Sequence, residues 1–321
     1  MQRWQGVLES NTWTDSKWVE FKAHRVHVTN LLEELHQRVV HVSGARLPWE
    51  PHGTLCLLGA GNCNDVDLRR LLRRFQTIEL VDIDADALAR GISRQLSSAA
   101  ATQRIKLHGS VDLFGVPYDE GTYEVEIDSS SSSRTSESHY ERVAAELSRG
   151  SAAATLSTLL SRRCDVVGAT GLLPMLVVQL QRYLGLTQIP VGERAMGGWD
   201  MALDVLCESY LRGLIAAVRP GGTVAHVSTL VFRSAALSNE TFSETDVLLE
   251  YIERGNFFPA TNPYSWITMD GGGTLHSAAL WPGRRGKKHG AYDSEGYLDR
   301  DSRPYWVWRS SLAYAVTWLA L

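Results

Sequence analysis

The fold is decided by two short stretches, TLCLLGAGN at residues 54–62 and TIELVD at residues 77–82. Each begins with an apolar run of strand length. The two glycines of the first stretch predict a turn, and the residues from Asp65 to Phe75 have the spacing of a helix. A strand, a glycine-rich turn, a helix, a second strand and an acid form the order in which parallel α/β domains build nucleotide sites.

This order has a physical reason at the carboxyl ends of the strands. Glycines let the backbone approach a ligand closely, and a helix that follows them presents free N–H groups. Asp82 lies 23 positions after Gly59, at the end of the second strand, where its carboxylate can accept hydrogen bonds from ribose hydroxyls. A dinucleotide loop would have a third glycine at position 64, which is Asn64, so a ligand without phosphates is favoured.

Strand-like and helical segments go on alternating after this unit. Residues 104–108, 165–170 and 223–232 are further strand-like runs, and helical patterns cover 85–96, 139–160, 172–184 and 201–218. The alternation predicts an α/β fold with a doubly wound, mostly parallel sheet. The later runs at 264–269, 275–280 and 305–321 are also strand-like, around a glycine turn at 271–273.

The remaining segments suggest how the chain is organised. Apolar residues at helical spacing between Ser16 and Val40 predict an N-terminal helical cap over residues 1–50, with the main domain at 51–321. Residues 128–138, DSSSSSRTSES, have the low complexity of a mobile surface loop.

Composition excludes several classes of protein. The formal net charge is −4, from 32 basic and 36 acidic residues, which gives no general attraction to nucleic acid. The first forty residues are too polar for a signal peptide, and no uninterrupted apolar run has the length of a membrane span, so we expect a cytoplasmic protein. The four cysteines form no CxxC pair, so we expect no zinc site and no disulfide framework.

These motifs resemble those of the class I S-adenosylmethionine-dependent methyltransferases. The resemblance covers about residues 52–232 and consists of five segments in the family's order: 55–63, 78–84, 110–113, 165–170 and 214–227. It implies S-adenosylmethionine as the cofactor and an antiparallel C-terminal strand, which makes a seven-stranded sheet. The cofactor-binding residues that it implies are Gly59, Ala60, Gly61 and Asn62 in the loop, Asp82 and Ile83 at the ribose, Asp112 and Leu113 at the adenine, and Ala169 and Thr170 near the methyl group.

Two positions depart from the family's pattern, and some residues have a second interpretation. Leu57 stands where an acid is common and Cys63 stands where a third glycine is common, and both concern the amino-acid end of the cofactor. Asp82 is also a candidate helix N-cap, although Asp84 fits that role better. Asp112 also suits a surface turn, and Thr170 also suits a simple strand end.

No catalytic residue follows from the sequence. Methyl transfer needs mainly an aligned nucleophile, and a base only if the acceptor must lose a proton. His226 is interpreted as a core histidine, whereas the aromatic residues at 199, 264 and 266 suit either an acceptor pocket or the core. We expect methyl transfer to a small molecule. The alternatives are a nicotinamide-dependent or aminopropyl-transferring enzyme, or a non-catalytic cofactor-binding partner protein; the oligomeric state is not defined.

Overall fold

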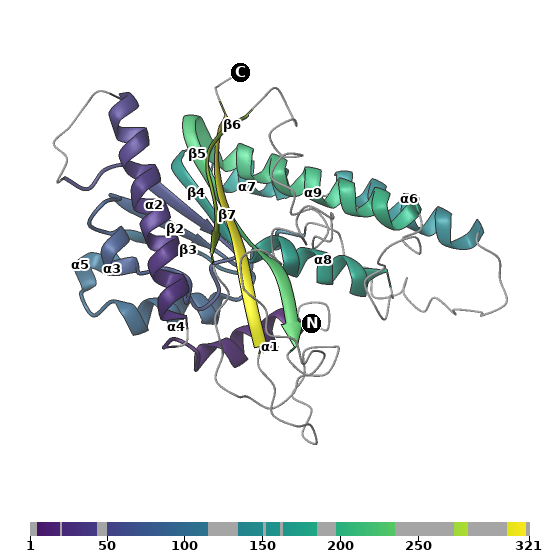
Figure 1. Ribbon diagram of the computed structural model, residues 1–321, viewed down its shortest axis with the longest axis horizontal. Helices are drawn as coiled ribbons and strands as arrows, with labels where there is room; N and C mark the ends of the chain where they lie inside the picture. The colour runs from purple at the N-terminus through teal and green to yellow at the C-terminus, as the bar shows by residue number, and fades with distance from the viewer. Residues whose placement is uncertain are drawn as a thin grey trace.

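A mostly parallel β-sheet forms the centre of the fold in the computed structural model (Figure 1). The structure describes residues 5–19, 21–43, 50–114, 134–149, 152–160, 163–184, 197–234, 273–281 and 307–318. Within these residues the sheet has seven strands in the order β3-β2-β1-β4-β5-β7-β6. They are β1 (Thr54–Leu58), β2 (Thr77–Val81), β3 (Ile105–His108), β4 (Cys164–Thr170), β5 (Val218–Ser234), β6 (Gly273–Trp281) and β7 (Val307–Trp318).

Strands β1 to β5 pair in parallel, and β7 pairs antiparallel with both β5 and β6. The predicted mostly parallel α/β sheet with flanking helices is confirmed. The central strand β1 is buried from Leu55 to Leu58, as expected for a parallel strand covered on both faces. Strand β5 begins before the predicted 223–232, and residues 264–269 lie outside the described part of the chain.

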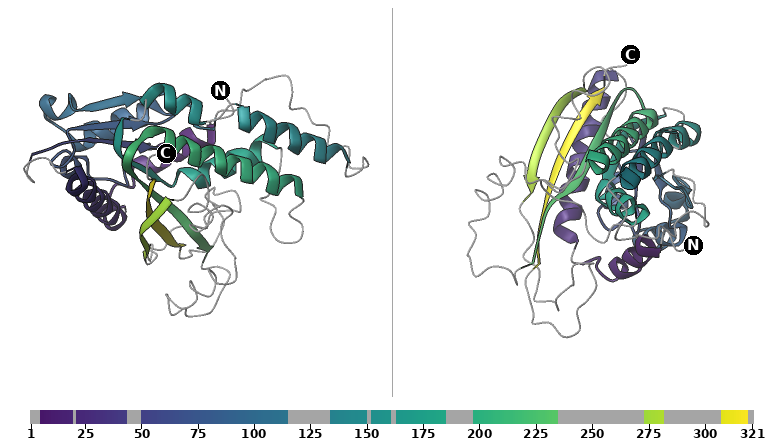
Figure 2. Two further views of the ribbon diagram at one scale, coloured as in Figure 1. Left: turned by 90° about the horizontal axis from the view of Figure 1, so that it is seen from above. Right: turned by 90° about the vertical axis from the view of Figure 1, so that its right-hand side faces the viewer.

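Helices cover both faces of the sheet (Figures 1 and 2). One apolar cluster joins β1 and β2 to α2, α3 and α4, and a second joins the opposite face to α6, α7, α8 and α9. The helices are α1 (Gln5–Asp15), α2 (Lys22–Ser43), α3 (Leu68–Leu71), α4 (Ala85–Gln95), α5 (Ala99–Thr102), α6 (Arg134–Arg149), α7 (Ala152–Leu160), α8 (Leu172–Tyr183) and α9 (Gly197–Ala217).

The two N-terminal helices have different surroundings. In α2, Val28, Leu32, Leu35 and Val39 are buried at intervals of three and four residues, the stripe that an amphipathic helix presents to a core. Burial of each such side chain contributes about 1.5–3 kcal/mol. Helix α2 is therefore a layer of the main fold, whereas α1 lies against α4 and the loop after β1.

Two segments differ from the sequence prediction. The helix predicted from residue 65 to 75 is reduced to the four residues of α3. Asp67 fixes its start, because its side chain accepts from the N–H of Arg70. Part of the serine-rich stretch is helical, since α6 begins at Arg134; residues 128–133 lie outside the described part of the chain. Further along α6, Val143, Ala144 and Leu147 are buried in the core.

Candidate functional site

The loop after β1 lies where the chain order of the strands reverses, because the strands on the two sides of β1 follow it in opposite directions across the sheet. Strand β1 has β2 on one side and β4 on the other, so its carboxyl end is the topological switch point at which open α/β sheets bind ligands. Gly59 and Gly61 both have positive φ, of 67° and 45°, a conformation that suits glycine. Gly59 and Gly61 therefore stand at the two positions of the turn that need a positive φ.

Asp82 meets this loop directly. Its Oδ2 accepts a hydrogen bond of 2.8 Å from the backbone N–H of Gly61, and its Oδ1 accepts one of 2.9 Å from the N–H of Asp84. Only 5% of Asp82 is exposed, and burial raises the pKa of its carboxyl while those two N–H groups oppose the rise. The loop and the acid thus converge on one point.

Asp84, rather than Asp82, caps α4. Its Oδ1 accepts from the N–H of Ala87 at 2.9 Å, and its backbone is extended, as an N-cap requires. The alternative interpretation of Asp82 as the cap is therefore wrong, and the carboxylate of Asp82 faces the glycine loop instead.

The N–H groups of the loop are largely used within the protein. Those of Gly59 and Ala60 donate to the carbonyl oxygen of Val81, at 2.9 and 3.3 Å, and that of Cys63 donates to the carbonyl of Ala60. The next helix, α3, is a single turn already capped by a carboxylate. A phosphate site needs free N–H groups at a helix N-terminus, so this loop is poorly suited to a pyrophosphate.

Cys63 occupies a backbone conformation that favours glycine. Its φ is 53°, in the left-handed region, at the position where the family's pattern has its third glycine. The side chain is 1% exposed and its thiol lies 3.9 Å from the carbonyl of Gly61. Burial raises the pKa of the Cys63 thiol, and the carboxylates of Asp82 and Asp65 raise it further. The loop thus keeps a glycine-like shape, and the carboxylates of Asp82 and Asp65 and the guanidinium of Arg94, which lowers the pKa of the thiol, lie near it.

The turn after β3 adjoins the same acid. The N–H of Val111 donates to the carbonyl oxygen of Asp82 at 3.1 Å, and Asp112 Oδ1 accepts from the N–H of Phe114 at 2.8 Å. Leu113 is buried in the core. The half-buried Asp112 therefore helps to form the turn, and its backbone segment lies next to Asp82.

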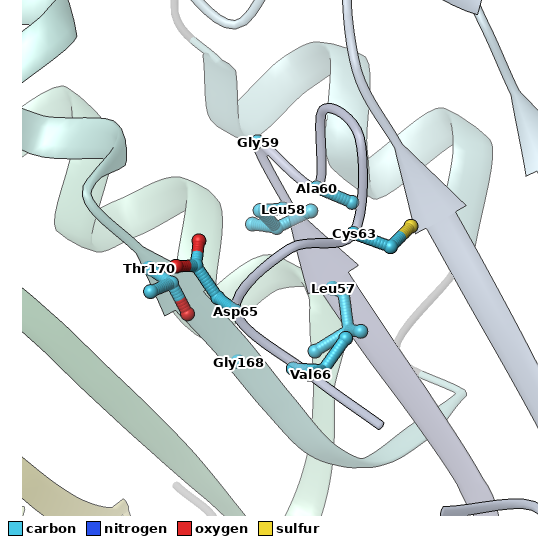
Figure 3. A pocket seen from close by; sticks show the side chains of 9 residues that line it. All are labelled: Leu57, Leu58, Gly59, Ala60, Cys63, Asp65, Val66, Gly168 and Thr170. Atoms are coloured by element: carbon cyan, nitrogen blue, oxygen red, sulfur yellow. The ribbon is translucent and has the colours of Figure 1, made fainter. Parts of the chain in front are cut away.

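A small pocket opens between β1 and β4 (Figure 3). Thr170 lines it from the end of β4, while the neighbouring Ala169 is buried in the core. Sequence reasoning missed Asp65, which lines the pocket from the loop after β1 and whose Oδ1 lies 3.1 Å from Nε2 of His24 in α2. Nothing local distinguishes an acid in a polar loop, and only the packing of α2 reveals its partner. The lining residues are Leu57, Leu58, Gly59, Ala60, Cys63, Asp65, Val66, Gly168 and Thr170.

Helix α1 lies over the tip of the loop. Asn11 Nδ2 donates to Asp84 at 3.2 Å, and Asn11 Oδ1 lies 2.8 Å from the position that a Cβ would take at Gly61. The side-chain amide of Asn62 donates to the carbonyl of Asn11 and to Thr14, but its Oδ1 is buried with no hydrogen-bond partner among the described residues. Polar contacts of the described side chains thus link α1 to the loop.

Other residues considered from the sequence have different surroundings. Trp199 is 1% exposed within the core, and it is not among the residues that line the pocket between β1 and β4. Cys56 and Cys164 are buried thiols as predicted. Tyr264 and Trp266 lie outside the described residues, as does the side chain of His226. Where the structure describes side chains, no three acidic, histidine or cysteine groups form a metal site; none of the described helices is long and apolar enough to cross a membrane.

Comparison with known proteins adds little. No family model and no curated protein matches the chain. Similar solved structures include an S-adenosylmethionine-dependent methyltransferase from Anabaena variabilis ATCC 29413, with 10% identity and a TM-score of 0.37 over 91% of this chain and 85% of that one. A 16S rRNA adenine methyltransferase from Catenulisporales acidiphilia has 10% identity and a TM-score of 0.35, over 89% of this chain and 94% of that one.

A geranyl diphosphate methyltransferase in complex with S-adenosylmethionine has 8% identity and a TM-score of 0.34, over 88% of this chain and 84% of that one. Likenesses with such low scores assign neither a fold nor an activity. The sheet order, the loop and the contacts of this chain are therefore what bear on its function.

Proposed function

We propose that this chain binds S-adenosylmethionine at the carboxyl ends of β1, β2 and β4 and transfers its methyl group to a small-molecule acceptor. The observation that carries the proposal is the contact between Gly61 and the buried carboxylate of Asp82, in a loop whose N–H groups at Gly59, Ala60 and Cys63 are used internally. Such a loop suits an adenosine without phosphates, because a ribose donates hydrogen bonds to a carboxylate and does not need N–H donors.

The polar atoms of the site fit such a ligand. A carboxylate has about four acceptor positions, and the backbone N–H groups of Gly61, Ile83 and Asp84 take part of those on Asp82. A ribose hydroxyl would take a remaining one. The buried Oδ1 of Asn62 is an acceptor that needs a donor, and a ligand hydroxyl or amino group would satisfy it.

The charge of the site supports a cationic ligand over an anionic one. Asp65 is the charged residue among the nine that line the pocket, and the carboxylate of Asp82 is near enough to Cys63 to raise the pKa of its thiol. A sulfonium is attracted to such a site, whereas the pyrophosphate of a nicotinamide dinucleotide is repelled. The nicotinamide-dependent alternative is disfavoured for this reason as well as for the missing glycine at Asn64.

Each predicted binding residue receives a role in this proposal. Asp82 and Ile83 bind the ribose, the segment at Asp112 and Leu113 borders the adenine, and the glycine loop contacts the rest of the adenosine. Thr170, at the end of β4, faces the reacting methyl group, and Ala169, whose side chain is buried in the core, borders the site through its backbone. When bound, S-adenosylmethionine supplies an electrophilic methyl group, and the task of these residues is to hold the acceptor in line with it.

The wider proposal concerns the fold and the acceptor. We assign residues 51–321 to a doubly wound domain closed by the antiparallel β7. Helix α2 packs in the core of this domain, so the N-terminal cap predicted for residues 1–50 is reduced to α1. The acceptor is a small molecule because the net charge of −4 offers no general attraction to nucleic acid. Cytoplasmic location stays a prediction of the sequence.

Thermal melting tests the proposal. S-adenosylmethionine and S-adenosylhomocysteine at saturating concentration should raise the melting temperature, because a ligand that binds only the folded state stabilises it. NAD should not raise it. Neither S-adenosylmethionine nor S-adenosylhomocysteine should raise the melting temperature of Asp82→Ala. Protection by NAD alone would favour an oxidoreductase. Binding of S-adenosylmethionine without turnover of any acceptor would favour a non-catalytic partner protein.

A further inference from the structure

The pocket between β1 and β4 combines an apolar wall with one carboxylate. Leu57, Leu58 and Val66 line it together with Asp65 (Figure 3). A carboxylate in such surroundings is costly unless it has a partner or serves a ligand. Leu57 lies in the same pocket, at the position where the resemblance leads one to expect an acid, and it brings no charge.

Asp65 is held in place by a helix distant in the sequence. His24 Nε2, from α2, lies 3.1 Å from Asp65 Oδ1, and the two side chains are only 24% and 27% exposed. Helix α2 is fixed to the sheet by its buried apolar stripe, so the imidazole position is set by the core. Among the described residues, Oδ2 of Asp65 has no hydrogen-bond partner and remains able to accept one.

The two carboxylates near Cys63 belong to different sides of the loop. Asp82 contacts Gly61 and the end of β2, where we propose the ribose, and Asp65 faces the pocket toward β4. Both act electrostatically on the same thiol, so both lie close to the loop. A ligand that spans the loop would therefore meet Asp82 at one end and Asp65 at the other.

We propose that Asp65 binds the ammonium group at the amino-acid end of the ligand, with His24 as its positioning residue. This rests on the proposed function. A carboxylate and an ammonium form a charge-assisted hydrogen bond, which is among the stronger polar contacts in proteins. Asp65 is the acidic residue that the lining of this pocket offers for such a contact.

Two ligands distinguish the role of Asp65 from the proposed binding of S-adenosylmethionine itself. S-adenosylhomocysteine carries the amino-acid end, and 5′-methylthioadenosine keeps the adenosine but lacks that end. In calorimetric titrations, Asp65→Asn should weaken S-adenosylhomocysteine by roughly 10- to 100-fold, the usual effect of losing a hydrogen bond to a charged group. The affinity for 5′-methylthioadenosine should stay within about twofold of wild type.

Controls make the outcome decisive. Asp86→Asn removes an exposed acid from α4 and should leave both affinities unchanged. His24→Ala should lower the preference for S-adenosylhomocysteine over 5′-methylthioadenosine, which a purely structural role would not change, and it serves as the test if Asp65→Asn fails to fold. Equal losses for both ligands, or no loss for either, would overturn the role of Asp65. A folded wild type that binds neither would instead refute the proposed function.

Discussion

Gly91 of α4 fixes the distance between that helix and the proposed cofactor loop. A Cβ at this position would lie 2.5 Å from the carbonyl oxygen of Asn62 and 3.1 Å from the Cβ of Cys63. The first contact is with backbone, which cannot rotate away. In Gly91→Ala the helix and the loop must therefore separate by roughly 1 Å to reach ordinary van der Waals contact.

Two opposing effects set the change in stability. In an exposed helix, Gly→Ala stabilises by about 0.8–1 kcal/mol, because alanine has the higher helix propensity. Overpacking of a close contact costs about 1–3 kcal/mol. We expect Gly91→Ala to be destabilised by about 1 kcal/mol net, since the backbone clash exceeds the gain in propensity. A loop displaced by about 1 Å should also bind S-adenosylhomocysteine on the order of 10- to 100-fold more weakly.

Urea unfolding and calorimetric titration measure the two effects. The matched control is Ala89→Gly, an exposed position of the same helix. It should lose about 1 kcal/mol of unfolding free energy with no change in affinity. If Gly91→Ala were more stable than wild type and bound the ligand equally well, the close packing of α4 on the loop would be refuted.

Three further changes test other contacts. Asn11→Ala removes the side chain over the loop tip, so stopped-flow association of S-adenosylhomocysteine should be faster; a large loss of affinity would instead make Asn11 a ligand contact. Burial pushes the pKa of Glu79 upward, but hydrogen bonds from His108 and Lys106 hold it below its usual value. The charged Glu79 therefore stabilises the fold fully above about pH 4.3, and this stabilisation is lost as the pH falls through the lower pKa of the folded state. The difference in unfolding free energy between wild type and Glu79→Gln should shrink as the pH is lowered. A difference that stays constant with pH would contradict this. Arg104→Ala loses hydrogen bonds to three backbone carbonyls near α3, which should cost about 2–3 kcal/mol in urea unfolding, and unchanged stability would contradict the contact.

Much of the fold could be predicted because its signals are local. The apolar run before Gly59, the acid after β2 and the glycines at positive φ all depend on neighbours in sequence. The parallel sheet follows from alternating strands and helices. Helix α3 was overestimated because apolar spacing does not show that Asp67 and Gln95 hold the chain at residues 67 and 68.

The site was harder to predict because its partners are distant in sequence. Asp65 contacts His24, and Asn62 contacts α1, and neither contact can be recognised from the sequence. Trp199 shows the converse, since an aromatic residue after two glycines is a core residue here. Composition and spacing identify the loop, and tertiary packing decides which side chains surround it.

A calorimetric titration of the folded wild-type chain with S-adenosylhomocysteine tests most directly whether an adenosine binds where Gly61 meets Asp82. We predict a saturable heat with one site per chain, and none with NAD under the same conditions. No heat with S-adenosylhomocysteine, from protein whose cooperative unfolding shows that it is folded, would contradict the assignment.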